Sequence, residues 1–280
     1  MLDGPQRLPH AYVLYGGRSV ALGKLPPKID PRTLQMRALL ISGNLPRLPR
    51  MVDNSDSGDG WPMYRNDKWG CCTCVTAAHM TQLHSIIARR TPTVPTDADV
   101  LAFYQRVTEL EGGRFDPISG ANDNGAIELD LLNQWRRYPI GGQKIFAFAA
   151  VEPDDEDLVR AGIYVFGGLY IGIALPLSAR RQLAAKQPWE VVADPATSIP
   201  GSWGGHAVCV LAYDPEGLTI ATWGTTQRMT WGFWHRYVDE SYVAAPMQWK
   251  TRGAHPAFNW NELMGNLDAL GTLNPDPVTP

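Results

Sequence analysis

The chain has 280 residues, of which 44% are hydrophobic and 19% charged, and its net charge is −3 at pH 7. A chain of this size and composition can bury a sizeable core, and its small net charge gives no reason to expect nucleic acid or an anionic membrane as a partner. No apolar run is long enough to span a bilayer, and the first residues do not resemble a secretory signal, so we expect a cytoplasmic protein.

Helices are predicted for the first half of the chain, after a Pro- and Gly-rich extended arm over residues 1–60. Thr96 is followed three residues later by Asp99, which is a capping signature for a helix start, and a pair of glycines at 112 and 113 closes that helix. In chain order, helices are predicted within the arm near Pro31–Leu40, from Gly70 to Thr91, from Thr96 to 112, at Ala126–Tyr138 and at Pro153–Phe166.

Short β-rich segments follow in the second half, separated by Pro, Gly and Asp turns. They are LYIGIALPL (169–177), HAVCVLAYD (206–214), LTIATWG (218–224) and YVAAPMQW (242–249). Helices followed by strands predict an α+β protein with segregated layers. We expect the arm at 1–60, a main domain at 61–250 with a helical half (61–150) and a β-rich half (151–250), and a C-terminal helix and tail at 251–280.

Three of the four cysteines lie in the stretch WGCCTC, residues 69–74. A structural zinc site needs four Cys or His ligands, usually as two spaced pairs, and the chain has no second CxxC. A disulfide framework is not expected in a long chain with so few cysteines, and Cys209 in its apolar run reads as a buried thiol. We therefore predict no metal and no cofactor, and interpret the cluster as a nucleophile with neighbours.

The geometry of the helix predicted after Gly70 indicates that only one of the cysteine thiols can act as the nucleophile. A helix N-terminus stabilises a thiolate through its free N–H groups, and Cys72 and Cys74 point about 200° apart on a helix. A cysteine nucleophile also needs a base, most often histidine. Of the six histidines, His206 stands out, because it follows a double glycine at the start of a predicted strand.

Three blocks of the sequence, in this order, resemble the signature blocks of papain-like cysteine proteases: GCCTCVTAAH, GGHAVCVLAYD and TWGTTQRMTWGFWHRYV. Cys72 and His206 are 134 residues apart, inside the roughly 130–150 residues typical of nucleophile and base in this group. The resemblance covers about residues 60–245 and implies a helical half that carries the nucleophile, packed on an antiparallel barrel-like half with a cleft between them. The chain is also similar to uncharacterised bacterial and bacteriophage proteins, so we expect a virion location if it is phage-encoded.

The resemblance also implies roles for particular residues. Papain-like proteases carry a side-chain amide six residues before the nucleophile, which donates to the oxyanion; with Cys72 as nucleophile this residue is Asn66. With Cys74 instead, the position holds Lys68, so Cys72 is preferred and Cys74 stays the alternative. His206 is then the base, and Trp223 corresponds to the tryptophan that shields the histidine.

One position departs from the family pattern. The asparagine that orients the histidine in the family is replaced by Ala221, which cannot form a side-chain hydrogen bond. Strand alternation is expected to point the adjacent Thr222 to the other face. A backbone carbonyl, a water or a carboxylate such as Asp214 remains to orient His206.

Three functions are compatible with these residues. The first is a thiol hydrolase that cleaves an amide bond in a protein, a peptide or a peptidoglycan cross-link, with no nucleic acid or membrane partner. The second is a weak or inactive papain-like module with a binding role, such as a phage particle component; the third is an acyl transferase. A hydrolase is expected to have an open cleft, a transferase a narrow tunnel, and a binding module a cleft filled by the arm or by tryptophans.

The loop at 112–127 is expected either to border the cleft or to be a plain turn.

Overall fold

The computed structural model of the chain describes residues 11–13, 19–40, 45–89, 92–247, 249, 259 and 261–265. Its helices are the 3-10 helix η1 (Met36–Leu39) and the α-helices α1 (Cys72–Arg89), α2 (Asp97–Leu110), α3 (Glu128–Arg137), α4 (Glu156–Phe166), α5 (Leu177–Ala184) and α6 (Trp231–Tyr237). Its strands are β1 (Ala11–Val13), β2 (Ser19–Ala21), β3 (Val52–Asp53), β4 (Ile145–Ala150), β5 (Leu169–Leu175), β6 (Gly204–Asp214), β7 (Gly217–Thr222), β8 (Thr225–Thr230) and β9 (Val238–Pro246). None of the helices in these residues is long and apolar enough to cross a membrane.

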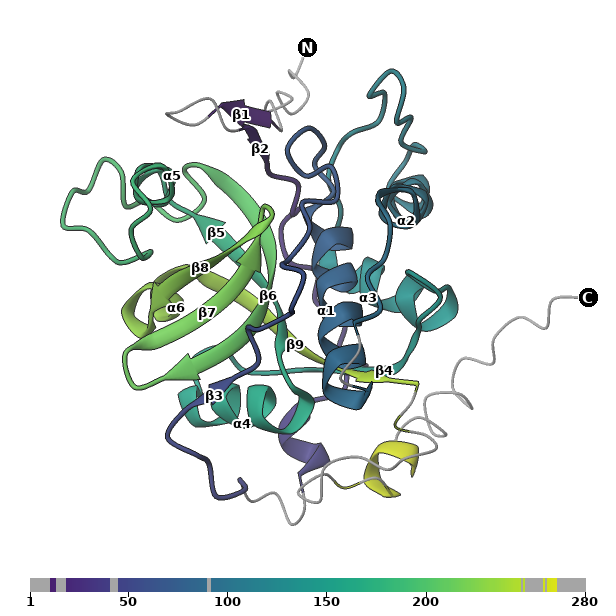
Figure 1. Cartoon of the computed structure of the whole chain (residues 1–280), viewed down its shortest axis with the longest axis vertical. Helices are drawn as coiled ribbons and strands as arrows, with labels where there is room; N and C mark the ends of the chain where they lie inside the picture. Colours follow the sequence, from purple (N-terminus) through teal and green to yellow (C-terminus); the bar gives the residue numbers. More distant parts are fainter. Residues whose placement is uncertain are drawn as a thin grey trace, which may run out of the picture.

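A seven-stranded antiparallel sheet forms the centre of the molecule. Its strands follow the order β4-β9-β5-β6-β7-β8, and β3 pairs with β6. The helices α1, α2 and α3 lie to one side of the sheet, and α4 and α6 lie to the other (Figure 1). The predicted α+β class, with the helical half packed on an antiparallel sheet, is confirmed, and the expected barrel-like half is an open sheet whose pairing ends at β4 and β8.

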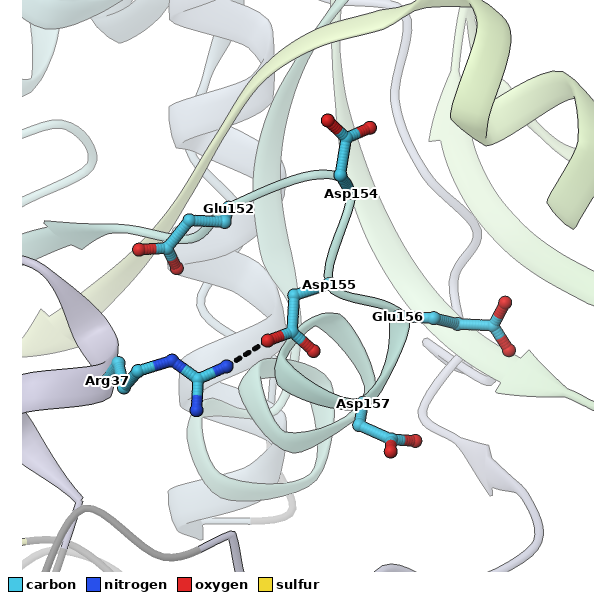
Figure 2. Close-up of a pocket in the computed structure, with 6 residues that line it drawn as sticks. All are labelled: Arg37, Glu152, Asp154, Asp155, Glu156 and Asp157. Carbon is cyan, nitrogen blue, oxygen red and sulfur yellow. Dashed lines mark hydrogen bonds and ion pairs between the residues drawn. The ribbon is translucent and has the colours of Figure 1, made fainter.

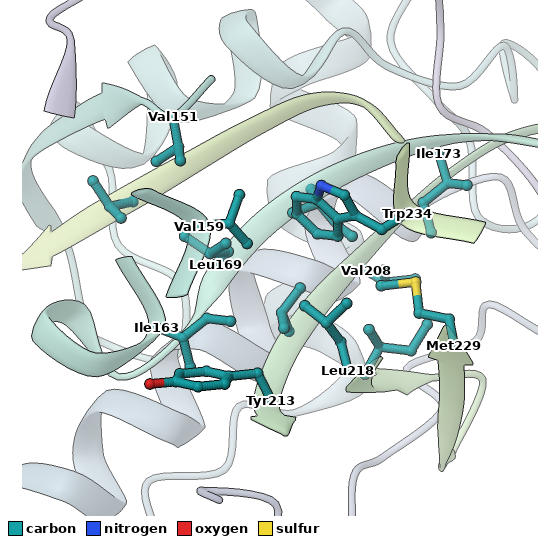
Figure 3. Packing of buried hydrophobic residues seen from close by; sticks show 14 of the residues in the cluster. Val151, Val159, Ile163, Leu169, Ile173, Val208, Tyr213, Leu218, Met229 and Trp234 are labelled. Atoms are coloured by element: carbon teal, nitrogen blue, oxygen red, sulfur yellow. The ribbon is translucent and has the colours of Figure 1, made fainter. Parts of the chain in front are cut away.

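The middle strands of the sheet are buried on both faces. On one face, Tyr170 and Cys209 pack in the cluster that also contains the apolar residues of α1. On the other, Ile171 and Val208 pack in a second cluster together with residues of α4 and α6. Figure 3 shows this second cluster, in which side chains of α4 meet side chains of the sheet. Burial on both faces explains why β5 and β6 read as near-continuous apolar runs.

The helix boundaries follow local capping chemistry. The Thr96 hydroxyl accepts from the Asp99 N–H, and the Asp99 carboxylate accepts from the Thr96 N–H, so the predicted capping box is confirmed. The helix α4 begins at Glu156, later than predicted, because the carboxylate of Asp155 accepts from the N–H of Leu158 and caps the start. Sequence patterns missed β4, β8, α5 and α6, which are short elements formed largely through tertiary packing.

The terminal segments lie partly outside the described residues. Within the arm, the helix predicted near Pro31–Leu40 is reduced to η1. Within the predicted C-terminal segment, residues 261–265 are helical. Most of 251–280 and residues 1–10 lie outside the described residues.

Candidate active site

A tight turn places Cys72 at the first position of α1. The N–H of Gly70 lies 3.0 and 3.2 Å from the two carboxylate oxygens of Asp123, and the Tyr104 hydroxyl donates to the same carboxylate at 2.8 Å. At the helix start the backbone N–H groups have no intrahelical partner and favour negative charge nearby. Of the two alternatives left open for the loop at 112–127, the structure therefore favours a loop beside this site, where Asp123 anchors the turn before Cys72.

The surroundings of the cysteines differ. All four cysteines of the chain are free and buried. The thiol of Cys72 faces the backbone N–H groups of Ala207 and Gly23, both of which act to lower its pKa. Cys71 instead donates its thiol to the carbonyl of Tyr64, at 3.6 Å. Cys72 thus interacts with the backbone of Ala207, the residue after His206.

His206 lies on β6, the residue before Ala207, and is 1% exposed. Its ring stacks on the indole of Trp223, with centroids 3.9 Å apart and planes at 11°. Its Nε2 shares a hydrogen bond of 2.7 Å with the hydroxyl of Thr222. Within the described part of the chain, its Nδ1 has no hydrogen-bond partner. The imidazole is therefore held by stacking and by one nitrogen, which leaves the other nitrogen for a reaction.

The expectation that Thr222 points away from His206 is wrong. Ala221 pairs with Cys209, which lies an odd number of residues from His206 along β6 and therefore on the opposite face. The next residue, Thr222, returns to the His206 face at the end of β7. The proposed alternative, Asp214, is also excluded as the orienting group, because it lies at the far end of β6 in an ion pair with Arg228 at 2.9 Å.

The side-chain amide of Asn66 is buried and its donors are in use. Its Nδ2 donates to the carbonyl of Trp69 at 2.9 Å and to the carbonyl of Ala21 at 3.1 Å. Ala21 belongs to the N-terminal arm, and the same carbonyl accepts from the Trp223 indole N–H at 3.0 Å. A peptide carbonyl of the arm thus occupies the donor that Asn66 was expected to offer to substrate.

The arm crosses the whole site. We call Val20–Leu25 the covering segment; it begins within β2 and runs beside the start of α1 (Figure 1). The N–H groups of Gly23 and Lys24 donate to the carbonyl of Gly205 at 3.3 and 3.1 Å. On the other side, Ala126 donates to the carbonyl of Gly23 at 2.7 Å and accepts from Leu25 at 3.0 Å. Sequence analysis named a cleft filled by the arm only as the mark of a binding module, because no local pattern records which surface an extended segment covers.

The covering segment also passes unusually close to the turn before Cys72. A Cβ added to Gly23 would lie 1.8 Å from the carbonyl oxygen of Gly70. A side chain at this position would therefore collide with backbone, and only glycine permits the observed approach.

Burial keeps both Cys72 and His206 neutral under the covering segment. Loss of solvation raises the pKa of Cys72 to about 12, although the N–H groups of Ala207 and Gly23 oppose the rise. The same loss of solvation lowers the pKa of His206 to about 3, with the nearby His79 as a smaller cause. At neutral pH the closed form therefore holds a thiol and an uncharged imidazole, not a thiolate and an imidazolium.

An open depression elsewhere on the surface does not belong to this site. It has a volume of about 640 Å³ and is lined by Arg37, Glu152, Asp154, Asp155, Glu156 and Asp157. Figure 2 shows these side chains around the start of α4, with Arg37 paired to Asp155. In Figure 1, α4 lies at the opposite end of the molecule from β2.

Among the described residues, no group of three or more His, Cys, Asp or Glu side chains could hold a metal ion.

Comparison with known proteins defines the fold. No family model matches the sequence, and no curated protein matches it. Among solved structures, xylellain, a cysteine protease from Xylella fastidiosa, is similar over 80% of this chain and 95% of its own, with a TM-score of 0.58 and 16% identity. Procathepsin B S9 from Trypanosoma congolense aligns with 80% of this chain and 86% of its own, at a TM-score of 0.49 and 11% identity. The likeness to xylellain shows that the fold is that of papain-like cysteine proteases.

Proposed function

We propose that the protein is a papain-like thiol hydrolase that cleaves amide bonds in a protein or peptide, with Cys72 as nucleophile and His206 as base. One observation carries the proposal: the Cys72 thiol begins α1 and faces the N–H next to His206, whose ring is fixed by Trp223 and Thr222. The covering segment supports a polypeptide substrate over a peptidoglycan cross-link, because it is itself an extended chain held by backbone hydrogen bonds, as in strand addition.

In the proposed reaction, His206 takes the thiol proton while the Cys72 sulfur attacks the carbonyl carbon. The amide C–N bond then breaks, His206 returns the proton to the leaving amine, and a thioester remains on Cys72. Water attacks the thioester, with His206 again as base, and releases the carboxylate and the free thiol. The Cys72 N–H and the Asn66 amide would stabilise the oxyanion, and losing one such donor typically costs about 10²–10³ in rate.

This mechanism requires the covering segment to leave. Asn66 regains a free N–H when the Ala21 carbonyl departs, and the pair of Cys72 and His206 regains solvent. Both pKa values then return toward their ordinary ranges, because burial is the first cause of each shift. We therefore infer that the covered form is the resting form of the enzyme.

The test is the rate at which iodoacetamide labels Cys72 in the Gly23→Ala variant. The added methyl group collides with the Gly70 carbonyl and displaces the covering segment, so labelling at neutral pH is expected to rise at least 10²-fold over the wild-type chain. Gly265→Ala is the matched control, since a Cβ at Gly265 meets nothing within 4 Å. Peptide mapping identifies the labelled cysteine.

The same variant then receives His206→Ala and is tested on a mixture of unstructured peptides. Slower labelling and lost cleavage are expected, because the imidazole no longer activates the thiol. Labelling centred on Cys74 would change the assigned nucleophile. Slow labelling of every cysteine in Gly23→Ala, unaffected by His206→Ala, would exclude the hydrolase.

That last result would favour the second candidate, a non-catalytic papain-like module. The observation in its favour is that the arm fills the site and leaves Cys72 1% exposed. An inactive module keeps a slow, unselective thiol even when the covering segment is displaced, whereas a covered enzyme does not. Reactivity in the displaced form therefore separates the two functions, while reactivity in the wild-type chain does not.

A further inference from the structure

Lys24, in the covering segment, buries its side chain in an acidic pocket in which Glu240 is buried and Asp239 is 30% exposed. The Lys24 side chain is 1% exposed, and its ammonium lies 2.9 Å from a carboxylate oxygen of Asp239 and 3.0 Å from one of Glu240. It also donates to the carbonyl of Leu25 at 3.3 Å. The Tyr242 hydroxyl donates to the second oxygen of Glu240 at 2.9 Å and fixes that carboxylate.

A third carboxyl group, that of Glu128, acts electrostatically on the same ammonium without forming an ion pair with it within 4 Å. Glu128 is fully buried at the start of α3, and within the described residues neither of its oxygens has a hydrogen-bond partner. Burial disfavours the Lys24 charge, but Glu128, Glu240 and Asp239 together outweigh it and raise the pKa of Lys24. The Lys24 ammonium therefore pairs with two carboxylates, while burial raises the pKa of Glu128 well above its usual range. A buried carboxyl group without any partner is costly unless a ligand or proton satisfies it.

The floor of the pocket is shaped to admit a long side chain. A Cβ added to Gly172 on β5 would lie 2.0 Å from Cε of Lys24 and 2.8 Å from Cγ of Glu240. The absence of a side chain at Gly172 thus makes the room through which the Lys24 stem passes. The pocket thus has room for a methylene chain beside Gly172 and carboxylates at its end, which matches the shape of a basic side chain.

The pocket also lies at a fixed place relative to the reactive thiol. Lys24 follows Gly23, the residue whose N–H faces Cys72. The backbone on both sides of Lys24 is held by Ala126 and Gly205, which would pair with any extended peptide in the cleft. A side chain in the pocket therefore belongs to a residue close to the one that lies over Cys72.

We propose that this pocket, formed by Glu128, Asp239, Glu240 and Gly172, recognises a lysine or arginine side chain of the polypeptide that binds in the cleft, and that Lys24 occupies it in the covered form. The inference rests on the proposed function in requiring a cleft that binds an extended polypeptide, and it deepens that function by naming the substrate class. Substrates then carry a basic residue at a fixed position within two residues of the cleaved bond.

The first test measures binding without turnover. The full chain carrying Cys72→Ala and Lys24→Met is titrated with the nonapeptide SVALGKLPP, which copies residues 19–27, and with the same peptide containing norleucine in place of lysine. The lysine peptide is expected to bind at least 10-fold more tightly. Glu128→Gln with Glu240→Gln is expected to abolish this preference, and Glu152→Gln with Glu216→Gln, two exposed positions, is the control for charge alone.

Gly172→Ala provides a second variant that fills the pocket without changing its charge. It is expected to lower the affinity for the lysine peptide more than the affinity for the norleucine peptide. Equal binding of the two peptides, no binding of either, or a lysine preference that survives both sets of pocket variants would overturn the proposal. Circular dichroism confirms that each variant is folded before titration.

The second test maps cleavage of a degenerate peptide library by the Gly23→Ala chain. A basic residue is expected at one fixed position near each cut, and the preference is expected to fall at least 10-fold in Glu128→Gln with Glu240→Gln. Cleavage without a preference for a basic residue would contradict the proposed role of the pocket but would support the hydrolase function. Selective binding of the lysine peptide without any cleavage would support the proposed role of the pocket but would contradict the hydrolase function.

Discussion

Cys72 and His206 lie under the same covering segment as the Lys24 pocket, but they differ in charge: Cys72 and His206 are neutral, whereas Lys24 and its carboxylate partners in the pocket are charged. Cys72 and His206 are held neutral by loss of solvation, with pKa values of about 12 and about 3. In the pocket, the ammonium of Lys24 lies against the carboxylates of Asp239 and Glu240 and keeps its charge. The covering segment is therefore anchored by ions at Lys24 and rests on uncharged groups at Cys72.

The difference has a physical consequence for how the site opens. The neutral groups under the segment hold it by hydrogen bonds that each contribute about 0.5–1.5 kcal/mol net. Leaving a buried charge without its partner costs several kcal/mol. The ion pairs of Lys24 are thus the largest single contribution that holds the segment. A cation that competes with Lys24 for the pocket is expected to promote release of the segment. Three predictions test this comparison.

The largest effect is expected for Lys24→Met. It leaves the carboxyl groups of the pocket without a cation, which costs about 3–5 kcal/mol for a buried pair unless the segment is released. We expect the covering segment to lose hydrogen-exchange protection, measured at the N–H groups of Lys24 and Leu25, and Cys72 to label faster.

Lys28→Met is the matched control for this variant. Lys28 pairs with Asp130 at 2.7 Å, but its side chain is 50% exposed, and exposed pairs contribute about 0–1 kcal/mol. If both variants showed the same protection, Lys24 would not be the anchor of the covering segment.

An intermediate effect is expected for Thr222→Val in the Gly23→Ala background. Valine keeps the shape of threonine but removes the hydroxyl that bonds His206, so we expect kcat for peptide cleavage to fall about 10–10²-fold and the pH profile to shift. Thr222→Ser keeps a hydroxyl and is expected to restore most of the rate. Equal loss in both variants would assign Thr222 a packing role only.

The smallest effect concerns acid stability and the buried His84 on α1. Burial lowers the pKa of His84 from 6.5 to about 4, so the folded state binds this proton less readily than the unfolded state. The contribution of His84 is complete above pH 6.5 and is lost as the pH falls from 6.5 toward 4. Glu111, whose pKa burial raises to about 7, acts in the opposite direction, because its folded form takes up a proton first.

Comparison with His84→Gln isolates the histidine from Glu111. Between pH 6.5 and 4.5, the free energy of unfolding is expected to fall more in the wild-type chain than in the variant, by on the order of 1–2 kcal/mol. Urea unfolding at each pH provides the measurement. Parallel curves would mean that the His84 pKa is not shifted.

Much of the fold was readable from local pattern. The capping box at Thr96 fixed the start of α2, and the runs around His206 and Tyr170 identified β6 and β5, since capping and hydrophobic runs are properties of neighbouring residues. The placement of Thr222 was not readable, because it depends on the register between β6 and β7. The pocket residues Glu128 and Glu240 were missed as well, since they are far apart in sequence and neither has a local motif.

The sequence by itself determined the α+β class and the helix that begins at Cys72, and it named Cys72, His206, Asn66 and Trp223 as the residues to examine. Only the tertiary structure decided that Thr222 holds His206, that the arm covers Cys72, and that Lys24 pairs with Asp239 and Glu240. The physical reason is the range of the interactions. Helix caps and strand patterns arise between residues a few positions apart, whereas burial, strand register and the pairing of distant charges arise only when the whole chain is folded.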